Sequence, residues 1–141
     1  MPVHTESIEI ARPPDEVWAL LGEPERWMEG YVETRSRSSG YPGPGTQNDH
    51  VFRTRMNENV AARVVSSERP TRLEEAHEGR TFSRRLEYRL APADGGTLLT
   101  VHDDITFKGL AKLAGPMAFR DVKRRWAASL ERLRVAAEGR P

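Results

Sequence analysis

Four polar side chains of kinds that move protons or hold anions fall on the otherwise apolar face of predicted strands: Glu75, His77, Arg84 and Asp103. In such a group His77 or Glu75 could act as a base that removes a proton beside a carbonyl. Arg84 could hold the oxygen of the resulting enolate, and Asp103 could orient Arg84. These are the catalytic residues that we expect if the protein is an enzyme.

Arg84 interrupts the alternation of TFSRRLEYRL, residues 81–90, because it stands in the apolar register of a predicted strand. The turn PADGG connects this strand to the next and predicts that Pro92 pairs with Thr97. The further pairs are then Leu90 with Leu99, Tyr88 with Val101, Leu86 with Asp103, Arg84 with Ile105 and Phe82 with Phe107. Both residues are apolar in three of these five pairs, which supports the register, and Asp103 lies diagonal to Arg84.

The turn EGR on the other side of the same strand predicts a second acidic neighbour for Arg84. The predicted pairs across it are His77 with Phe82, Glu75 with Arg84 and Leu73 with Leu86. A buried arginine needs partners because an unpaired buried charge is strongly destabilising, and Glu75 and Asp103 supply them. Two placements of Arg84 remain open. It faces the cavity with these partners, or it lies near the rim with its charged end in solvent.

Alternating apolar residues and turn signals predict a series of strands between two helical regions. Strands are expected at residues 3–10, 31–37, 48–56, 60–67, 72–77, 81–90 and 97–107, with NEN, residues 57–59, as a turn. Pro13 and Pro14 begin a helix that Gly22 ends, and a second short helix is expected around residues 25–29. The loop SSGYPGPGT, residues 38–46, is either a plain strand connection or a mobile flap at the mouth of a cavity.

A long amphipathic helix is predicted near the C-terminus. Its apolar residues are spaced by three or four: Phe119, Val122, Trp126, Leu130, Leu133 and Ala137. Gly115 and Pro116 begin this helix and Gly139 ends it, while its basic residues are expected to form a solvated face. A curved antiparallel sheet of six to seven strands can bury one face against such a helix. The fold class is therefore α+β, with a cavity wherever side chains do not fill the gap.

The inward face of the sheet and the helix stripe together supply apolar walls for a ligand. The residues expected to bind it are Phe52, Phe82, Leu86, Tyr88, Leu99, Val101 and Trp126. His50 faces the same cavity if it shares the inward face with Phe52. Glu75, His77 and His50 have no recognised metal-ligand spacing, so we expect neither a metal site nor a cofactor.

Composition limits the classes of function. The chain of 141 residues has the usual size of one domain, 37% of its residues are apolar, 30% are charged, and its net charge is +1. This balance gives no reason to expect nucleic acid or an anionic membrane surface as a partner. There is no cysteine, and no apolar stretch reaches the roughly 18 residues that span a bilayer. Residues 1–10 lack a basic region followed by an apolar run, so we expect no signal peptide. We expect a single domain over residues 1–141, cytoplasmic, without membrane insertion, and monomeric or weakly dimeric.

Four stretches that together run from Ile8 to Glu138 carry a resemblance to a known family: IEIARPPDEVWALLGEPERW, ARVVSSERPTRLEE, YRLAPADGGTLLTVHDDITFKG and FRDVKRRWAASLERLRVAAE. They resemble the START-like superfamily, also called SRPBCC, and within it the polyketide cyclase/dehydrase and lipid-transport group. The resemblance implies a helix-grip fold, in which the sheet wraps around the C-terminal helix, with a deep cavity for an apolar ligand. The segment RLEEAHEG departs from the family, which carries apolar or aromatic residues there. Either the cavity is unusually polar or this strand is shifted.

The resemblance favours a protein that binds a small apolar or amphipathic metabolite, such as a polyketide, lipid or quinone, for transport or protection. The alternative is a cyclase or dehydratase that acts on a poly-β-ketone chain through the four polar residues named first. A third class, a protein-interaction module, would need an exposed apolar patch, which the sequence does not locate. The first two differ in whether a polar pair lies deep in the cavity, beside space for a substrate.

Overall fold

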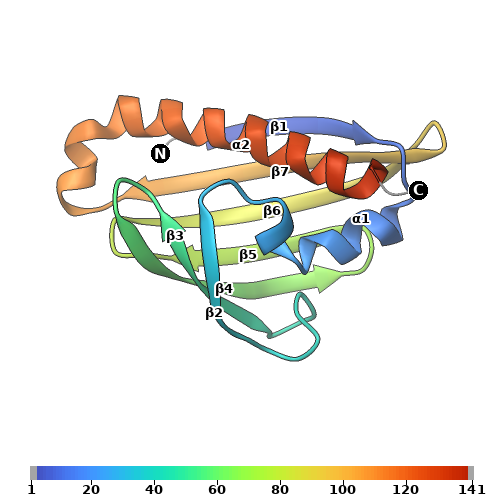
Figure 1. Ribbon diagram of the computed structural model, residues 1–141, viewed down its shortest axis with the longest axis horizontal. Helices are drawn as coiled ribbons and strands as arrows, with labels where there is room; N and C mark the ends of the chain where they lie inside the picture. Colours follow the sequence, from blue (N-terminus) through green and yellow to red (C-terminus); the bar gives the residue numbers. More distant parts are fainter. Residues whose placement is uncertain (1–2, 140–141) are drawn as a thin grey trace.

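The computed structural model describes residues 3–139 as an open antiparallel sheet with a long helix across one face (Figure 1). The strands are β1 (Val3–Ile10), β2 (Tyr31–Arg37), β3 (Gln47–Arg53), β4 (Asn57–Glu68), β5 (Arg72–Glu78), β6 (Phe82–Ala93) and β7 (Gly96–Phe107), and they pair in the order β1-β7-β6-β5-β4-β3-β2. The helices are α1 (Pro14–Leu21), η1 (Pro24–Arg26), η2 (Gly109–Ala114) and α2 (Gly115–Glu138). The predicted α+β arrangement, with two short helices after the first strand and a long C-terminal helix, is confirmed; η2 was not predicted.

Helix α2 begins and ends where the sequence predicts. Pro116 stands in its first turn, where a missing N–H does no harm, and Gly139 follows its last residue. The buried residues of its apolar stripe are Val122, Trp126, Leu130, Leu133 and Ala137, and Phe119 is partly buried against them. Burial of this stripe holds α2 on the sheet, since each Å² of apolar surface removed from water contributes about 25 cal/mol.

Three aromatic side chains join α2 to the sheet and to the short helices. Trp126 of α2 packs 6.2 Å from Tyr88 of β6 and 6.5 Å from Trp27, as measured between ring centroids. Trp27 follows η1 and donates its indole N–H to the carbonyl of Leu20 in α1 at 2.6 Å. This cluster fills the space under the middle of α2 and fixes the depth at which Trp126 sits.

The predicted register between β6 and β7 is confirmed at every pair. The observed pairs include Leu86 with Asp103, Arg84 with Ile105 and Phe82 with Phe107. The turn residues 94 and 95 both have positive φ angles, 43° for Asp94 and 81° for Gly95, as a tight hairpin turn requires. The local turn chemistry therefore determines which residues of β7 face Arg84.

The predicted register between β5 and β6 is wrong by two residues. The observed pairs are His77 with Arg84, Glu75 with Leu86 and Leu73 with Tyr88. The turn is tighter than predicted, because the N–H of Gly79 donates to the carbonyl of Phe82 at 2.9 Å. A shift of two residues keeps each side chain on its face, so Glu75, His77 and Arg84 still point inward.

Glu58 of β4 holds this turn from a neighbouring strand. Its carboxylate accepts hydrogen bonds from the backbone N–H groups of Arg80 at 2.8 Å and Thr81 at 3.0 Å, and from the hydroxyl groups of Thr81 and Thr54. Burial raises the pKa of the Glu58 carboxyl, but these donors outweigh burial and hold the pKa below its ordinary value. Glu58 and Arg80 are 22 residues apart, so local sequence patterns do not predict their contact.

The turn between β3 and β4 lies earlier in the chain than predicted. Residues 54–56 form the turn, in which the N–H of Thr54 donates to the carbonyl of Met56, and Arg53 pairs with Asn57. The segment NEN, predicted as a turn, lies inside β4. This placement puts Glu58 on the inward face of β4, where it meets its donors.

Candidate functional site

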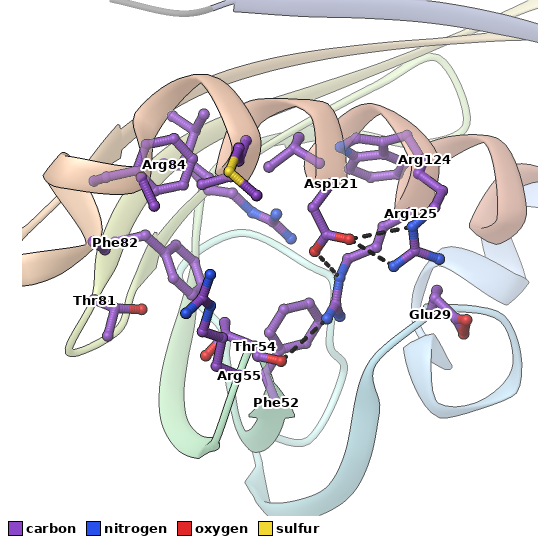
Figure 2. A pocket seen from close by; sticks show the side chains of 18 of the residues that line it. Glu29, Phe52, Thr54, Arg55, Thr81, Phe82, Arg84, Asp121, Arg124 and Arg125 are labelled. Carbon is purple, nitrogen blue, oxygen red and sulfur yellow. Dashed lines mark hydrogen bonds and ion pairs between the residues drawn. The ribbon is translucent and has the colours of Figure 1, made fainter.

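A cavity of about 760 Å³ lies between the first half of α2 and the ends of β3, β6 and β7 (Figure 2). Its apolar wall is formed by Met28, Phe52, Met56, Phe82, Ile105, Phe107, Leu110, Ala111, Ala114, Met117, Ala118, Val122 and Trp126. Its polar wall is formed by Glu29, Thr54, Arg55, Thr81, Arg84, Asp121, Arg124, Arg125 and Ser129. Volume and lining together are those of a site for a small organic molecule.

Arg84 stands on the wall of this cavity, and its guanidinium points toward the middle (Figure 2). Its side chain is only 8% exposed, so the rim placement is wrong. The guanidinium carbon lies 5.8 Å from the ring of Phe52, 5.5 Å from that of Phe82 and 5.8 Å from that of Trp126. Three aromatic rings therefore surround a charge that is almost wholly removed from water.

Asp103 is the counter-ion of Arg84. Its Oδ2 lies 3.5 Å from Nη1 of Arg84 and accepts a hydrogen bond of 2.8 Å from the indole N–H of Trp126. The Arg84 distance is longer than the roughly 2.7–2.9 Å of a charge-assisted hydrogen bond. Within residues 3–139, Nε of Arg84 and Oδ1 of Asp103 have no hydrogen-bond partner. The pair is thus neutral in sum while its hydrogen-bonding capacity remains partly unused.

A second polar cluster lies deeper, on β5. The ring Nε2 of His77 lies 2.9 Å from Oε1 of Glu75, and the hydroxyl of Tyr41 donates to Oε2 of the same carboxylate. Burial and the Glu75 charge raise the pKa of the Tyr41 hydroxyl well above its ordinary value, so Tyr41 remains a donor. Glu75 and His77 are each 2% exposed, and neither lines the cavity. Glu75 and His77 thus face inward on β5, and their side chains bond to each other and to Tyr41.

His50 of β3 extends this cluster toward the surface. Its ring stacks on Tyr31 with 4.5 Å between centroids and lies 6.2 Å from the ring of His77. Its Nδ1 lies 3.3 Å from the amide nitrogen of Asn48. Burial, with the neighbouring His77 and Arg84, lowers the pKa of His50 to about 3. His50 is therefore neutral in the folded protein at physiological pH.

We expect His50 to make the protein less stable as the pH falls below about 6.5. The unfolded chain takes up a proton on His50 near its ordinary pKa of about 6.5, whereas the folded protein does so only at about 3. The unfolded state thus binds more protons between these values, and stability falls by up to about 1.4 kcal/mol per pH unit.

Urea unfolding at a series of pH values measures this effect. Between about pH 6.5 and 5, the wild type should lose about 1.7 kcal/mol more than His50→Gln. Equal losses in the two proteins would contradict the assignment. His102→Gln, on the outward-facing side of β7, controls for the loss of a histidine elsewhere.

Sequence reasoning missed Arg125, which was assigned neither to the apolar stripe of α2 nor to the ligand site. Arg125 is only 17% exposed; its Nε donates to Asp121 at 2.8 Å, and its guanidinium carbon lies 5.3 Å from the ring of Phe52. Gly30 makes room for it, because a Cβ there would lie 2.2 Å from Nη1 of Arg125, and its φ of +92° also favours glycine. The sequence did hold one indication of this position: Arg125 follows Val122 by three residues, which places it at the edge of the apolar stripe of α2.

The residues predicted to bind a ligand fall into two groups. Phe52, Phe82 and Trp126 line the cavity. The others have at most 2% exposure, lie in packed core and do not line the cavity: Leu86, Tyr88, Leu99 and Val101. They share the inward face but lie farther along β6 and β7, where Trp27 and α2 already fill the space.

The loop at residues 38–46 does not form the mouth of this cavity. None of its residues lines the wall, and Tyr41 turns inward to bond Glu75. The mouth is formed instead by the β3–β4 turn, η2 and the start of α2. Across residues 3–139, no cluster of three or more acidic or histidine side chains has the arrangement of a metal site, and no helix is long and apolar enough to cross a bilayer.

Comparison with known proteins identifies a matching family and several solved structures of similar fold. The family described as polyketide cyclase / dehydrase and lipid transport matches residues 1–138. No curated protein matches the chain. The family match covers every element that builds the cavity.

Solved structures share the same architecture at low sequence identity. A START superfamily protein from Mycobacterium smegmatis superposes with a TM-score of 0.78 at 14% identity, over 97% of each chain. Ara h 8.0201 superposes with a TM-score of 0.73 at 18% identity, over 99% of this chain and 100% of its own. CalU16 from Micromonospora echinospora gives a TM-score of 0.67 at 22% identity, over 99% of this chain and 76% of its own. These likenesses establish a helix-grip fold and leave the chemistry of the site to its own residues.

Proposed function

This chain belongs to the polyketide cyclase / dehydrase and lipid transport family, and from that premise we propose that it binds a small amphipathic metabolite in the cavity under α2. The ligand has an apolar body and an oxygenated, electron-rich end. Polyketides, lipids and quinones are molecules of this class. Transport or protection of such a molecule, in the cytoplasm and by a monomer or weak dimer, is the role that we propose.

Arg84 is the observation that carries the proposal. Its side chain is 8% exposed, its guanidinium points into the cavity, and its Nε has no hydrogen-bond partner within residues 3–139. A buried donor without an acceptor costs about 1–3 kcal/mol, and more when it is charged. A carboxylate, enolate or carbonyl oxygen of a ligand would supply the missing acceptor, which favours an oxygenated molecule over a plain hydrocarbon.

The walls around Arg84 favour an apolar body for the same ligand. Phe52, Phe82 and Trp126 surround the guanidinium, and aliphatic side chains of β7, η2 and α2 continue the surface toward the mouth. Aromatic and aliphatic walls bind through the burial of apolar area, whereas a few polar groups orient the ligand. The division of polar and apolar residues thus matches an amphipathic molecule.

The cyclase alternative needs a base within reach of the substrate. Glu75 and His77, the bases predicted from the sequence, bond to each other and do not line the cavity. The carboxylates on its wall, Asp121 and Glu29, are held in ion pairs with arginines of α2. A general base must come within about 3 Å of the proton that it removes, directly or through one water. Arg84 can hold an oxygen without such a base, so the geometry favours binding over catalysis.

Blocking the cavity tests this function directly. Ala118 of α2 lines the cavity, whereas Ala127 of the same helix is exposed on its other side. The fluorescence of anilinonaphthalene sulfonate should report saturable binding to the wild type. We expect Ala118→Trp to weaken this binding at least about tenfold by filling the space, which corresponds to about 1.4 kcal/mol.

Ala127→Trp provides the matched control, because it adds the same side chain to solvent. It should bind the dye like the wild type, and Ala118→Met should give an intermediate result if the tryptophan variant unfolds. Unchanged binding by a folded Ala118→Trp protein would refute this cavity as the ligand site. Native mass spectrometry of protein purified from its own host would identify a co-purified ligand.

A further inference from the structure

The mouth of the cavity carries the most exposed large apolar side chains among residues 3–139. Leu110 is 85% exposed and Leu113 is 83% exposed, both in η2, followed by Met117 of α2 at 65% and Met56 of the β3–β4 turn at 63%. These four residues, which we call the apolar rim, come from two separate parts of the chain. Met56, Leu110 and Met117 line the cavity, and Leu113 belongs to the same short helix as Leu110. Exposed apolar side chains gathered in this way mark an interaction surface.

Basic residues surround the apolar rim. Residues 108–125 contain six lysines and arginines and one acidic residue, a local net charge of +5, whereas the whole chain has +1. Lys112, Arg120 and Arg55 are exposed and have no ion-pair partner within residues 3–139. Lys108 is paired with Glu78, and Arg124 with Asp121. The chain as a whole is therefore nearly neutral, but the surface around the mouth of the cavity is basic.

We propose that this face docks on an anionic phospholipid bilayer, with the apolar rim entering the headgroup region. The proposal goes beyond ligand binding, since it assigns a partner to the outer surface. Apolar side chains flanked by lysine and arginine are the combination that binds at the interface of anionic membranes. The basic side chains attract lipid phosphates, and transfer of the leucine and methionine side chains from water into the bilayer lowers the free energy.

The shape of the rim favours a bilayer over a folded protein partner. Leu110 and Leu113 are more than four-fifths exposed, so they protrude beside the opening, where Leu110 also lines the cavity. A fluid bilayer accommodates isolated protruding side chains, whereas a protein interface needs a large complementary surface. Docking in this orientation turns the opening of the cavity toward the lipid, so an amphipathic ligand can pass between them without crossing water.

Co-sedimentation with vesicles tests the proposal. We expect the wild type to partition onto vesicles made of equal parts phosphatidylcholine and phosphatidylglycerol, more strongly than onto phosphatidylcholine alone, and to be released by added salt. Leu113 and Lys112 do not line the cavity, so their substitution separates docking from ligand binding. Lys112→Glu should weaken partition at least about tenfold, since each basic side chain near an anionic bilayer contributes roughly fivefold. Leu113→Asp should have a similar effect.

Matched controls lie on other faces of the molecule. Val135→Asp places the same charge at an exposed apolar position in the second half of α2, and Arg63→Glu reverses a charge on the outer face of β4. Both should retain the wild-type partition. A loss in the controls equal to that of Leu113→Asp and Lys112→Glu would overturn the proposal, because the binding would then depend on overall charge.

A fluorescent probe at the rim gives a second readout. The native tryptophans are buried, with exposures of 2% for Trp18, 1% for Trp27 and 4% for Trp126. The added tryptophan of Leu113→Trp should shift to shorter emission wavelengths on anionic vesicles and be quenched by brominated lipids. Unchanged emission would overturn the proposal.

Two other results would also overturn the proposal of membrane docking. Failure of the wild type to sediment with anionic vesicles would favour an acidic protein surface as the partner of this face. A wild-type dimer that Leu113→Asp converts into a monomer would show that a second copy covers the apolar rim. Circular dichroism melting curves for each variant establish that the changes in partition come from the surface and not from unfolding.

Discussion

Arg84→Met is expected to weaken the binding of oxygenated ligands by roughly tenfold to a hundredfold and to leave hydrocarbon binding almost unchanged. A charge-assisted hydrogen bond contributes about 1.5–3 kcal/mol, which corresponds to that range of affinity. Methionine fills much of the same space and keeps an apolar contact with the rings of Phe52 and Phe82. The loss of affinity therefore measures what the positive charge of Arg84 and its N–H donors contribute to binding.

Two dyes with nearly the same aromatic body make the measurement direct. Anilinonaphthalene sulfonate carries an anionic group, and phenylnaphthylamine lacks it. Fluorescence titration of both should show a loss in Arg84→Met for the sulfonate alone. Arg85→Met is the control variant, because Arg85 is the next residue of β6 and is 52% exposed on the outer face.

Either of two outcomes would refute this role for Arg84. Equal affinities of Arg84→Met and wild type for the sulfonate would mean that the guanidinium does not contact the ligand. Equal losses for both dyes would mean that the substitution has changed the shape of the cavity. Arg84→Met is also expected to lower the free energy of unfolding by about 3–5 kcal/mol, because Asp103, which is 0% exposed, loses its counter-ion and remains as an unpaired buried charge.

Trp126→Ala is expected to lower the free energy of unfolding by about 3–5 kcal/mol. Trp126 is 4% exposed, packs against Trp27 and Tyr88, and donates its indole N–H to Asp103. Alanine would leave a void beside the existing cavity and remove a donor from a buried carboxylate. Guanidinium or thermal unfolding measures the change.

Trp126→Phe separates packing from the hydrogen bond. Phenylalanine keeps much of the ring contact but cannot donate to Asp103, so the expected loss is about 1–3 kcal/mol. A loss below about 1 kcal/mol in Trp126→Ala would contradict a packed position. A loss in Trp126→Phe equal to that in Trp126→Ala would place the whole effect in the hydrogen bond.

The sequence by itself determined the order of elements and the face of most side chains. The spacing of three and four in α2 and the alternation in β6 are local patterns, because the repeat of a helix or strand acts on neighbouring residues. The turn PADGG is equally local, and the register that it predicts for β6 and β7 is confirmed at every pair. Arg84 could be placed inward, diagonal to Asp103, for this reason alone.

Contacts between distant residues were decided only by the tertiary structure. Glu58 closes the turn between β5 and β6 from another strand, and this shifted Glu75 away from Arg84 and left His77 opposite it. Gly30 admits Arg125 against Phe52, so part of a basic run that looks solvated becomes part of the cavity wall. No periodic pattern records such contacts, because each depends on two segments that the fold brings together.

The position of the cavity and the apolar, basic character of its mouth were also decided only by the tertiary structure. Leu86, Tyr88, Leu99 and Val101 share the inward face with Phe82, yet Trp27 and α2 cover them and leave Phe82 on the cavity wall. The sequence predicts which face of a strand is apolar, but the void depends on where the covering helices end. The apolar rim and its basic surroundings likewise arise where η2 and α2 meet the β3–β4 turn, since charge and exposure add up in space and not along the chain.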